Sequence, residues 1–112
     1  MCNGYFLTHC RGCNPATVEL LISLGADVTA IGDYEENCLL RACRSGNDDN
    51  VIFLANAYPE LVNSRNYWFD TVLILASQNC KPVTLELLIS LGADVKAVGE
   101  HDTVVDFHEK PY

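Results

Sequence analysis

The chain has 112 residues, of which 49% are hydrophobic, and its formal net charge is −8 at pH 7. This length predicts one domain, and the apolar fraction is too high for a disordered chain. The charge argues against binding to nucleic acid or to an anionic membrane surface, and it favours a basic protein or peptide as partner.

One long stretch of sequence occurs twice, at 13–30 and at 80–97, with most positions identical. The offset between the copies corresponds to two successive units of about 33–34 residues each. The column Leu21, Leu54 and Leu88 locates the middle unit. Self-similarity at this period predicts stacked helical units that share one core. Chains of this kind usually bind rather than catalyse.

Each unit is expected to contain two helices and a connecting turn. The first repeated stretch predicts a helix between Pro15 and Gly25, because proline suits the start of a helix and glycine its end. Further along the chain we expect an extended turn at 31–37, a helix at 38–44, a helix beginning near Asp48, a turn at 64–70, and helices at 72–79 and 84–91.

The motif Leu-Gly-Ala-Asp-Val-x-Ala, at 24–30 and 91–97, resembles the second helix and exit of an ankyrin repeat, and 71–76 resembles the start of its first helix. The resemblance implies an all-α solenoid of stacked helix–turn–helix units with β-hairpin-like finger loops. We expect one domain over 1–112, divided into a repeat lacking its finger (1–31), two repeats (32–65 and 66–98), and a partial repeat or C-terminal cap (99–112).

Ankyrin repeats act as non-catalytic scaffolds that bind proteins through the finger tips and the exposed side of the inner helices. Carried over to this chain, the partner-binding positions are Asp33, Tyr34, Glu36, Tyr67, Trp68 and Asp70 on the fingers, and Arg44, Ser45, Gln78 and Asn79 on the inner helices. Tyr67 and Trp68 are expected to supply anchor area, and the three carboxylates to steer the partner.

Three consecutive aromatic residues, Tyr67, Trp68 and Phe69, stand in the second predicted finger. At a finger tip they would be exposed and suited to an interface. Alternatively, Trp68 or Phe69 packs back on the protein, and Phe69 is expected to be the more inward of the two because it replaces a turn residue. The sequence leaves both arrangements open.

A zinc or redox site is a remote alternative at His9, Cys10 and Cys13, whose spacing suits metal ligands. Against it, Cys10 lies in a column of small residues with Cys43 and Ser77, which suggests helix packing. His101 and His108 have no companion acid and nucleophile at a readable spacing. We therefore expect no enzyme activity, no bound metal and no cofactor.

The resulting hypothesis is a cytoplasmic, non-catalytic module that binds a protein or peptide, and that is monomeric if its ends are capped. The cytoplasmic expectation follows from a start without a secretion signal and from six cysteines, which are expected to be reduced. The main alternative is a structural spacer of a longer repeat array, supported by the apolar residues Val104, Val105 and Phe107 in the truncated last unit.

Overall fold

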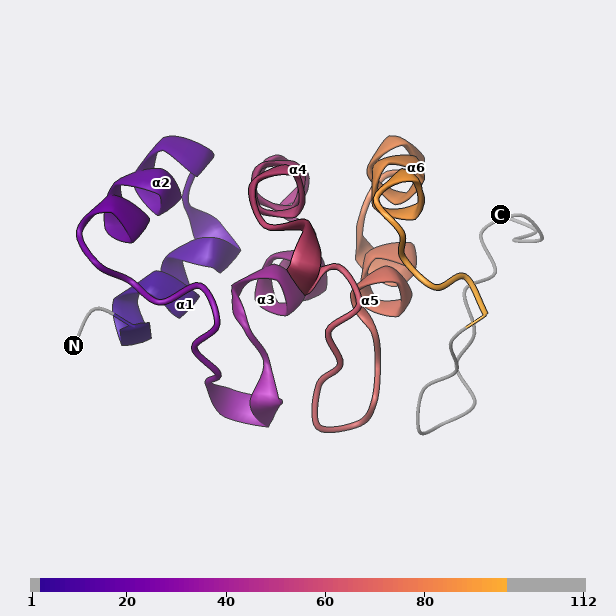
Figure 1. The fold of residues 1–112 in the computed structure, drawn as a ribbon, viewed down its shortest axis with the longest axis horizontal. Coiled ribbons are helices and arrows are strands. Elements are labelled where there is room, and N and C mark those ends of the chain that lie inside the picture. The colour runs from indigo at the N-terminus through magenta and orange to yellow at the C-terminus, as the bar shows by residue number, and fades with distance from the viewer. Residues whose placement is uncertain (1–2, 97–112) are drawn as a thin grey trace.

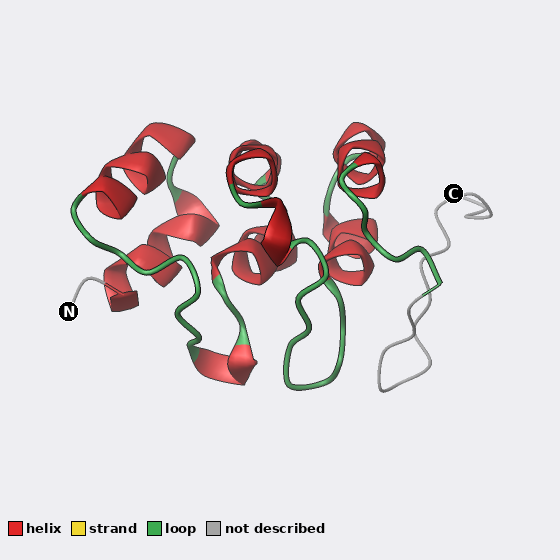
Figure 2. Cartoon of the chain, in the orientation of Figure 1, coloured by secondary structure: helices red, strands yellow, loops and turns green. Residues whose placement is uncertain are grey.

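The computed structural model describes residues 3–96, without the side chains of residues 3–5, 8 and 9. Within that range it contains six α-helices and two short 3-10 helices and no strand (Figure 2). The helices are α1 (Asn3–Gly12), α2 (Pro15–Ser23), η1 (Asp33–Glu35), α3 (Cys38–Ser45), α4 (Asp48–Ala57), η2 (Pro59–Leu61), α5 (Val72–Asn79) and α6 (Pro82–Ser90).

The α-helices form two layers, as Figure 1 shows. The inner layer holds α1, α3 and α5 side by side, and the outer layer holds α2, α4 and α6. Two long loops project from the inner layer on the side away from the outer helices. We call them the first finger, residues 31–37, and the second finger, residues 64–70. The predicted all-α class is confirmed. The only β-bridge among the described residues joins Arg65 of the second finger to Thr71, the residue that follows this finger.

Short polar side chains begin most of these helices. Asn37 accepts a hydrogen bond from the amide of Leu40 at 2.9 Å, and Thr71 accepts one from the amide of Ile74 at 3.1 Å. Such caps satisfy backbone N–H groups that have no partner inside the helix. Helix α6 lacks a side-chain cap of its own at Lys81. Asp48 of α4 supplies it instead, accepting from the Lys81 amide at 2.9 Å.

The core lies between the layers and runs through all three helix pairs. Leu54 and Leu88 are fully buried, and their counterpart Leu21 is half-buried against the same core. The small residues Ala42 and Ala76 are also fully buried, where the inner helices pack closely. Two members of the leucine column predicted from the repeat spacing, Leu54 and Leu88, therefore lie in the interior, and Leu21 lies at its edge.

Asparagine side chains tie α4 to the first helix pair. The amide of Asn50 donates to the carbonyls of Cys10 and Cys13, at 3.1 and 2.6 Å, and the amide of Asn47 donates to the carbonyl of Arg11 at 3.2 Å. These contacts satisfy carbonyls at the end of α1 that its own helix leaves free. The expectations for 99–112, including His101, His108 and the apolar residues near them, lie outside the described residues.

Candidate functional site

The two fingers adopt tight turns without glycine at their tips. Tyr34 and Glu35 in the first finger have φ values of 60° and 57°, and Phe69 in the second has a φ of 61°. Residues other than glycine rarely occupy this left-handed region, so surrounding contacts must hold the backbone there. One such contact joins the fingers directly, because the amide of Tyr67 donates to the carbonyl of Tyr34 at 2.7 Å.

Three rings from the two fingers form what we call the aromatic cluster: Tyr34, Tyr67 and Trp68. The rings of Tyr34 and Trp68 are 4.9 Å apart and tilted by 33°, and Tyr67 meets Trp68 edge-on at 5.5 Å. Both geometries are favourable for aromatic pairs. Tyr34 is 57% exposed and Tyr67 62%, whereas Trp68 is half-buried between them. The cluster thus presents ordered aromatic area to solvent.

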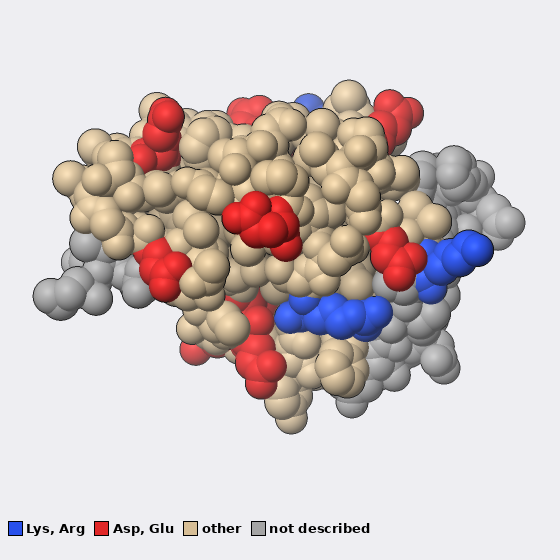
Figure 3. Space-filling view, in the orientation of Figure 1, with Lys and Arg blue, Asp and Glu red and all other residues tan. Residues whose placement is uncertain are grey.

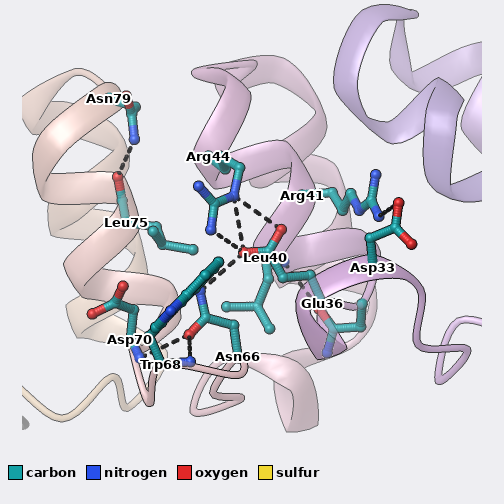
Figure 4. A network of polar contacts seen from close by, with 11 residues as sticks. Asp33, Glu36, Leu40, Arg41, Arg44, Asn66, Trp68, Asp70, Leu75 and Asn79 are labelled. Atoms are coloured by element: carbon teal, nitrogen blue, oxygen red, sulfur yellow. Dashed lines mark hydrogen bonds and ion pairs between the residues drawn. The ribbon is translucent and has the colours of Figure 1, made fainter. Parts of the chain in front are cut away.

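Beneath the cluster lies a buried carboxylate, Glu36, which is only 1% exposed. The Arg44 Nε group lies 3.0 and 2.9 Å from its two oxygens, and the Asn66 side chain donates to Oε2 at 3.0 Å (Figure 4). The hydrogen bond to Glu36 raises the pKa of Arg44 above its ordinary value. A buried charge is tolerated only when it is paired and hydrogen-bonded in this way.

Asn66, which belongs to the second finger, also fixes the backbone of that finger. Its side-chain oxygen accepts from the backbone amides of Trp68 and Asp70, at 2.9 and 3.0 Å. The Arg44 guanidinium also lies 5.8 Å from the ring centre of Tyr34 and 5.7 Å from that of Trp68. Both separations are within the range of cation–π attraction. Glu36, Arg44 and Asn66, which we call the polar network, therefore position the aromatic cluster.

Two expectations from the sequence are wrong at this site. Glu36 does not face a partner, because its carboxylate is buried and neutralised by Arg44. Phe69 is not the inward ring of the second finger: it is 60% exposed and lies against Arg65, whose Cζ atom is 5.8 Å from the ring centre. Trp68 packs inward instead, on Tyr34 of the preceding finger, because Asn66 holds its backbone there.

The other predicted partner-binding residues lie in the two fingers and on the inner helices. Asp33 is exposed at the tip of the first finger, 3.9 Å from Arg41. Asp70 is half-buried beside Trp68 (Figure 4), and its Oδ1 atom is buried without a hydrogen-bond partner among the described residues. Gln78 and Asn79 are exposed along α5, and Asn79 donates to the carbonyl of Leu75 at 2.9 Å.

Ser45 is exposed at the end of α3. Its hydroxyl donates to the carbonyls of Ala42 and Arg11, at 3.1 and 3.2 Å.

The ten predicted partner-binding positions divide into three groups. Tyr34, Tyr67 and Trp68 form the aromatic cluster, and Asp33 and Asp70 lie in the same two fingers. Glu36 and Arg44 lie beneath the cluster, and Ser45, Gln78 and Asn79 lie on the inner helices.

The proposed metal ligands are described only in part. The side chain of His9 lies outside the described residues, whereas Cys10 is buried and Cys13 half-buried. The neighbouring Cys38 thiol, followed by burial, raises the pKa of Cys10 well above its ordinary value. Among the side chains that the structure describes, no group of three His, Cys, Asp and Glu residues is placed to hold a metal ion.

None of the helices between residues 3 and 96 has both the length and the apolar character needed to cross a membrane.

Comparison with known proteins agrees with the helical architecture. The family model for ankyrin repeats, in three copies, matches residues 6–98. A curated relative, an ankyrin repeat and KH domain-containing protein of Caenorhabditis briggsae, is 29% identical over 89 residues, which cover 77% of this chain. The chain spans only 3% of the length of that relative.

Proposed function

Because this chain belongs to the ankyrin-repeat family, we propose that it is a non-catalytic module that binds a protein or peptide through its two fingers and inner helices. Ankyrin repeats are generally protein–protein interaction modules. The contact residues of the proposal are the aromatic cluster, Asp33 and Asp70, with Gln78 and Asn79 at its margin. Glu36 is assigned a positioning role in place of direct contact.

The observation that carries this proposal is the preorganised aromatic cluster. Its two tyrosines are more than half exposed, although their backbones are held by the bond from Tyr67 to Tyr34 and by the polar network. Tyrosine and tryptophan are the residues most enriched at binding hot spots. A surface that is ordered before binding loses little conformational entropy when a partner docks.

The distribution of charged side chains on the surface supports a basic protein or peptide as the partner. On the face seen in Figure 3, acidic side chains are spread along the stack and outnumber the basic ones. Within the polar network Arg44 is already paired with Glu36, so its positive charge is largely neutralised. Asp33, by contrast, has a side chain that is 89% exposed. Such a field attracts a cationic segment and accelerates its association.

The remaining assignments rest on composition and family. We assign the protein to the cytoplasm, as a monomer that binds neither nucleic acid nor membrane. The repeats are placed at 1–31, 32–65 and 66–98, and 99–112 is placed as a partial repeat or cap. No catalytic residue, cofactor or metal is assigned.

The test is a comparative pulldown with three immobilised proteins: the parent chain, Trp68→Ala and Leu20→Ala. Leu20 is the control because it is an apolar residue, 56% exposed, on the outer helix α2, whereas the half-buried Trp68 lies in the second finger. A partner captured by the parent and by Leu20→Ala but lost by Trp68→Ala supports the proposal. Partners retained equally by all three would contradict it.

The alternative is a structural spacer within a longer array. It is favoured by exposed apolar residues on the outer side of the first helix pair, since Leu20 is 56% and Leu24 64% exposed. Apolar surface of this kind is suited to contact with another unit. Light scattering separates the two functions, because a spacer cut from its neighbours self-associates through these residues and a capped module remains a monomer.

A further inference from the structure

Two cysteines from successive helix pairs meet beside the inner layer. Cys43 lies in α3 and is fully buried, and Cys80 follows the last residue of α5 and is half-buried. The Cys80 thiol donates to the carbonyl oxygen of Cys43 at 3.8 Å. The two residues come from different helix pairs, so a bond between their sulfurs would join those pairs covalently.

A second observation shows how closely the backbones approach there. A Cβ atom placed on Gly46, at the end of α3, would lie 2.8 Å from the carbonyl oxygen of Asn79 at the end of α5. Cys80 is the next residue after Asn79, and Cys43 lies within one turn of Gly46. Disulfides require Cα atoms within about 7 Å of each other, so close approach of the two chains is the main geometric condition.

We propose that Cys43 and Cys80 form a disulfide site that links the helix pair α3–α4 to the pair α5–α6 in the presence of a small disulfide oxidant such as glutathione disulfide. The Cys80 thiolate attacks one sulfur of the oxidant, which releases one glutathione and leaves glutathione bound to Cys80. The Cys43 thiol then loses its proton and attacks the Cys80 sulfur. A second glutathione leaves, so two electrons pass from the protein to one oxidant molecule.

The order of the two steps follows from accessibility. Cys80 is within reach of solvent, whereas Cys43 is not, so the oxidant meets Cys80 first. Burial, and then the Cys80 thiol beside it, raise the pKa of the Cys43 thiol well above its ordinary value. Cys43 is therefore protected from reagents in solution, since the thiolate is the reactive form, and it reacts only with a sulfur brought next to it.

The chain contains an internal control in Cys10 and Cys38. This pair also joins successive helix pairs, and the Cys38 thiol lies beside that of Cys10, but both residues are fully buried. Because neither thiol of this pair is exposed, the oxidant cannot reach a sulfur atom of Cys10 or Cys38 in the folded protein. We expect Cys10 and Cys38 to stay reduced in the folded protein while Cys43 and Cys80 react.

The experiment uses the full chain carrying Cys2→Ser, because Cys2 lies outside the described residues. The folded protein is incubated with glutathione disulfide, quenched with acid, alkylated, digested with trypsin and analysed by mass spectrometry. Cleavage at Arg44 and Arg65 separates the two cysteines, so the bond appears as a cross-linked pair of peptides. We expect the intact mass to fall by two hydrogen atoms, reversibly on reduction, and the thermal midpoint to rise.

Two variants complete the test. In Cys43→Ser the reaction is expected to stop with one glutathione bound to Cys80, whereas Cys13→Ser is expected to oxidise like the parent. Cys13 is the matched control because it is half-buried and occupies the position of Cys80 in the first repeated stretch. A lasting glutathione adduct on Cys80 in the parent, an unreactive Cys80, or equal oxidation of Cys10 and Cys38 would each overturn the proposal.

Discussion

The side-chain amide of Asn66 donates to the buried carboxylate of Glu36 over 3.0 Å, and this contact joins two successive fingers through their interiors. Glu36 stands just before α3 and Asn66 within the second finger, so the bond crosses from one repeating unit to the next. Arg44 completes the neutralisation of the carboxylate from α3. The exposed rings above are therefore held by charge and hydrogen bonding as well as by their own stacking.

Replacing Glu36 with Gln is expected to lower the free energy of unfolding by about 1–3 kcal/mol, the usual cost of leaving buried hydrogen-bonding groups without their partner. The amide keeps the shape of the side chain but presents N–H groups toward Arg44 and Asn66, which are themselves donors. Urea denaturation followed by circular dichroism measures the change.

Glu35→Gln is the matched control for this substitution. Glu35 is the adjacent residue, carries the same charge and is exposed. Glu35→Gln is expected to alter the free energy of unfolding by no more than about 0.5 kcal/mol, as for most surface substitutions. If the two substitutions change the free energy of unfolding equally, the buried hydrogen bonds of Glu36 do not stabilise the fold.

Trp68→Ala is expected to weaken partner binding by about 2 kcal/mol or more, as for an aromatic hot-spot residue. Removing the indole deletes the ring between Tyr34 and Tyr67, so the anchor area and the order of its neighbours are both lost. Isothermal titration calorimetry with the captured partner measures the loss. Undiminished affinity in a variant with a native circular dichroism spectrum would remove the cluster from the interface.

The repeat spacing predicts the helices and the core because their signals are local. Proline at the start of α2 and α6 and the helical pattern of leucines locate these helices to within a few residues of those observed. The buried Leu54 and Leu88 follow directly from the spacing.

The polar network was not predictable in the same way. Its members, Glu36, Arg44 and Asn66, come from the first finger, α3 and the second finger, and they carry no shared sequence pattern. Whether a carboxylate in a finger faces solvent or the interior depends on which cation the fold brings beneath it. The sequence wrongly predicted Phe69 as the inward ring for a similar reason. The hydrogen bond from the Trp68 amide to the Asn66 side chain fixes the backbone so that Trp68 points inward, and this contact has no sequence signature.

Leu54→Ala is expected to cost about 2–5 kcal/mol of stability, the range for truncating a fully buried leucine. Leu54 lies in α4, the central outer helix, which packs against both α2 and α6. Its counterpart Leu21 is only half-buried, so Leu21→Ala is expected to cost less. Chemical denaturation of the two variants compares them directly. A thermal midpoint that is unchanged in Leu54→Ala would contradict the shared core.

Gly46→Ala is expected to destabilise the protein by more than about 1 kcal/mol, for two separate reasons. The residue has a φ of 74°, a left-handed conformation that an alanine adopts with strain, and the new Cβ atom would lie 2.8 Å from the backbone oxygen of Asn79. A backbone oxygen cannot rotate away as a side chain can, so α3 and α5 must separate.

Gly12→Ala is the control for Gly46→Ala, because a Cβ atom at Gly12 meets no other atom within 4 Å and the backbone there is not left-handed. Alanine at such a position reduces the freedom of the unfolded chain, so Gly12→Ala is expected to be neutral or to stabilise by up to about 1 kcal/mol. Urea denaturation of both variants gives the comparison. If the two substitutions have the same effect on stability, the end of α3 at Gly46 does not lie as close to the end of α5 at Asn79 as the structure shows.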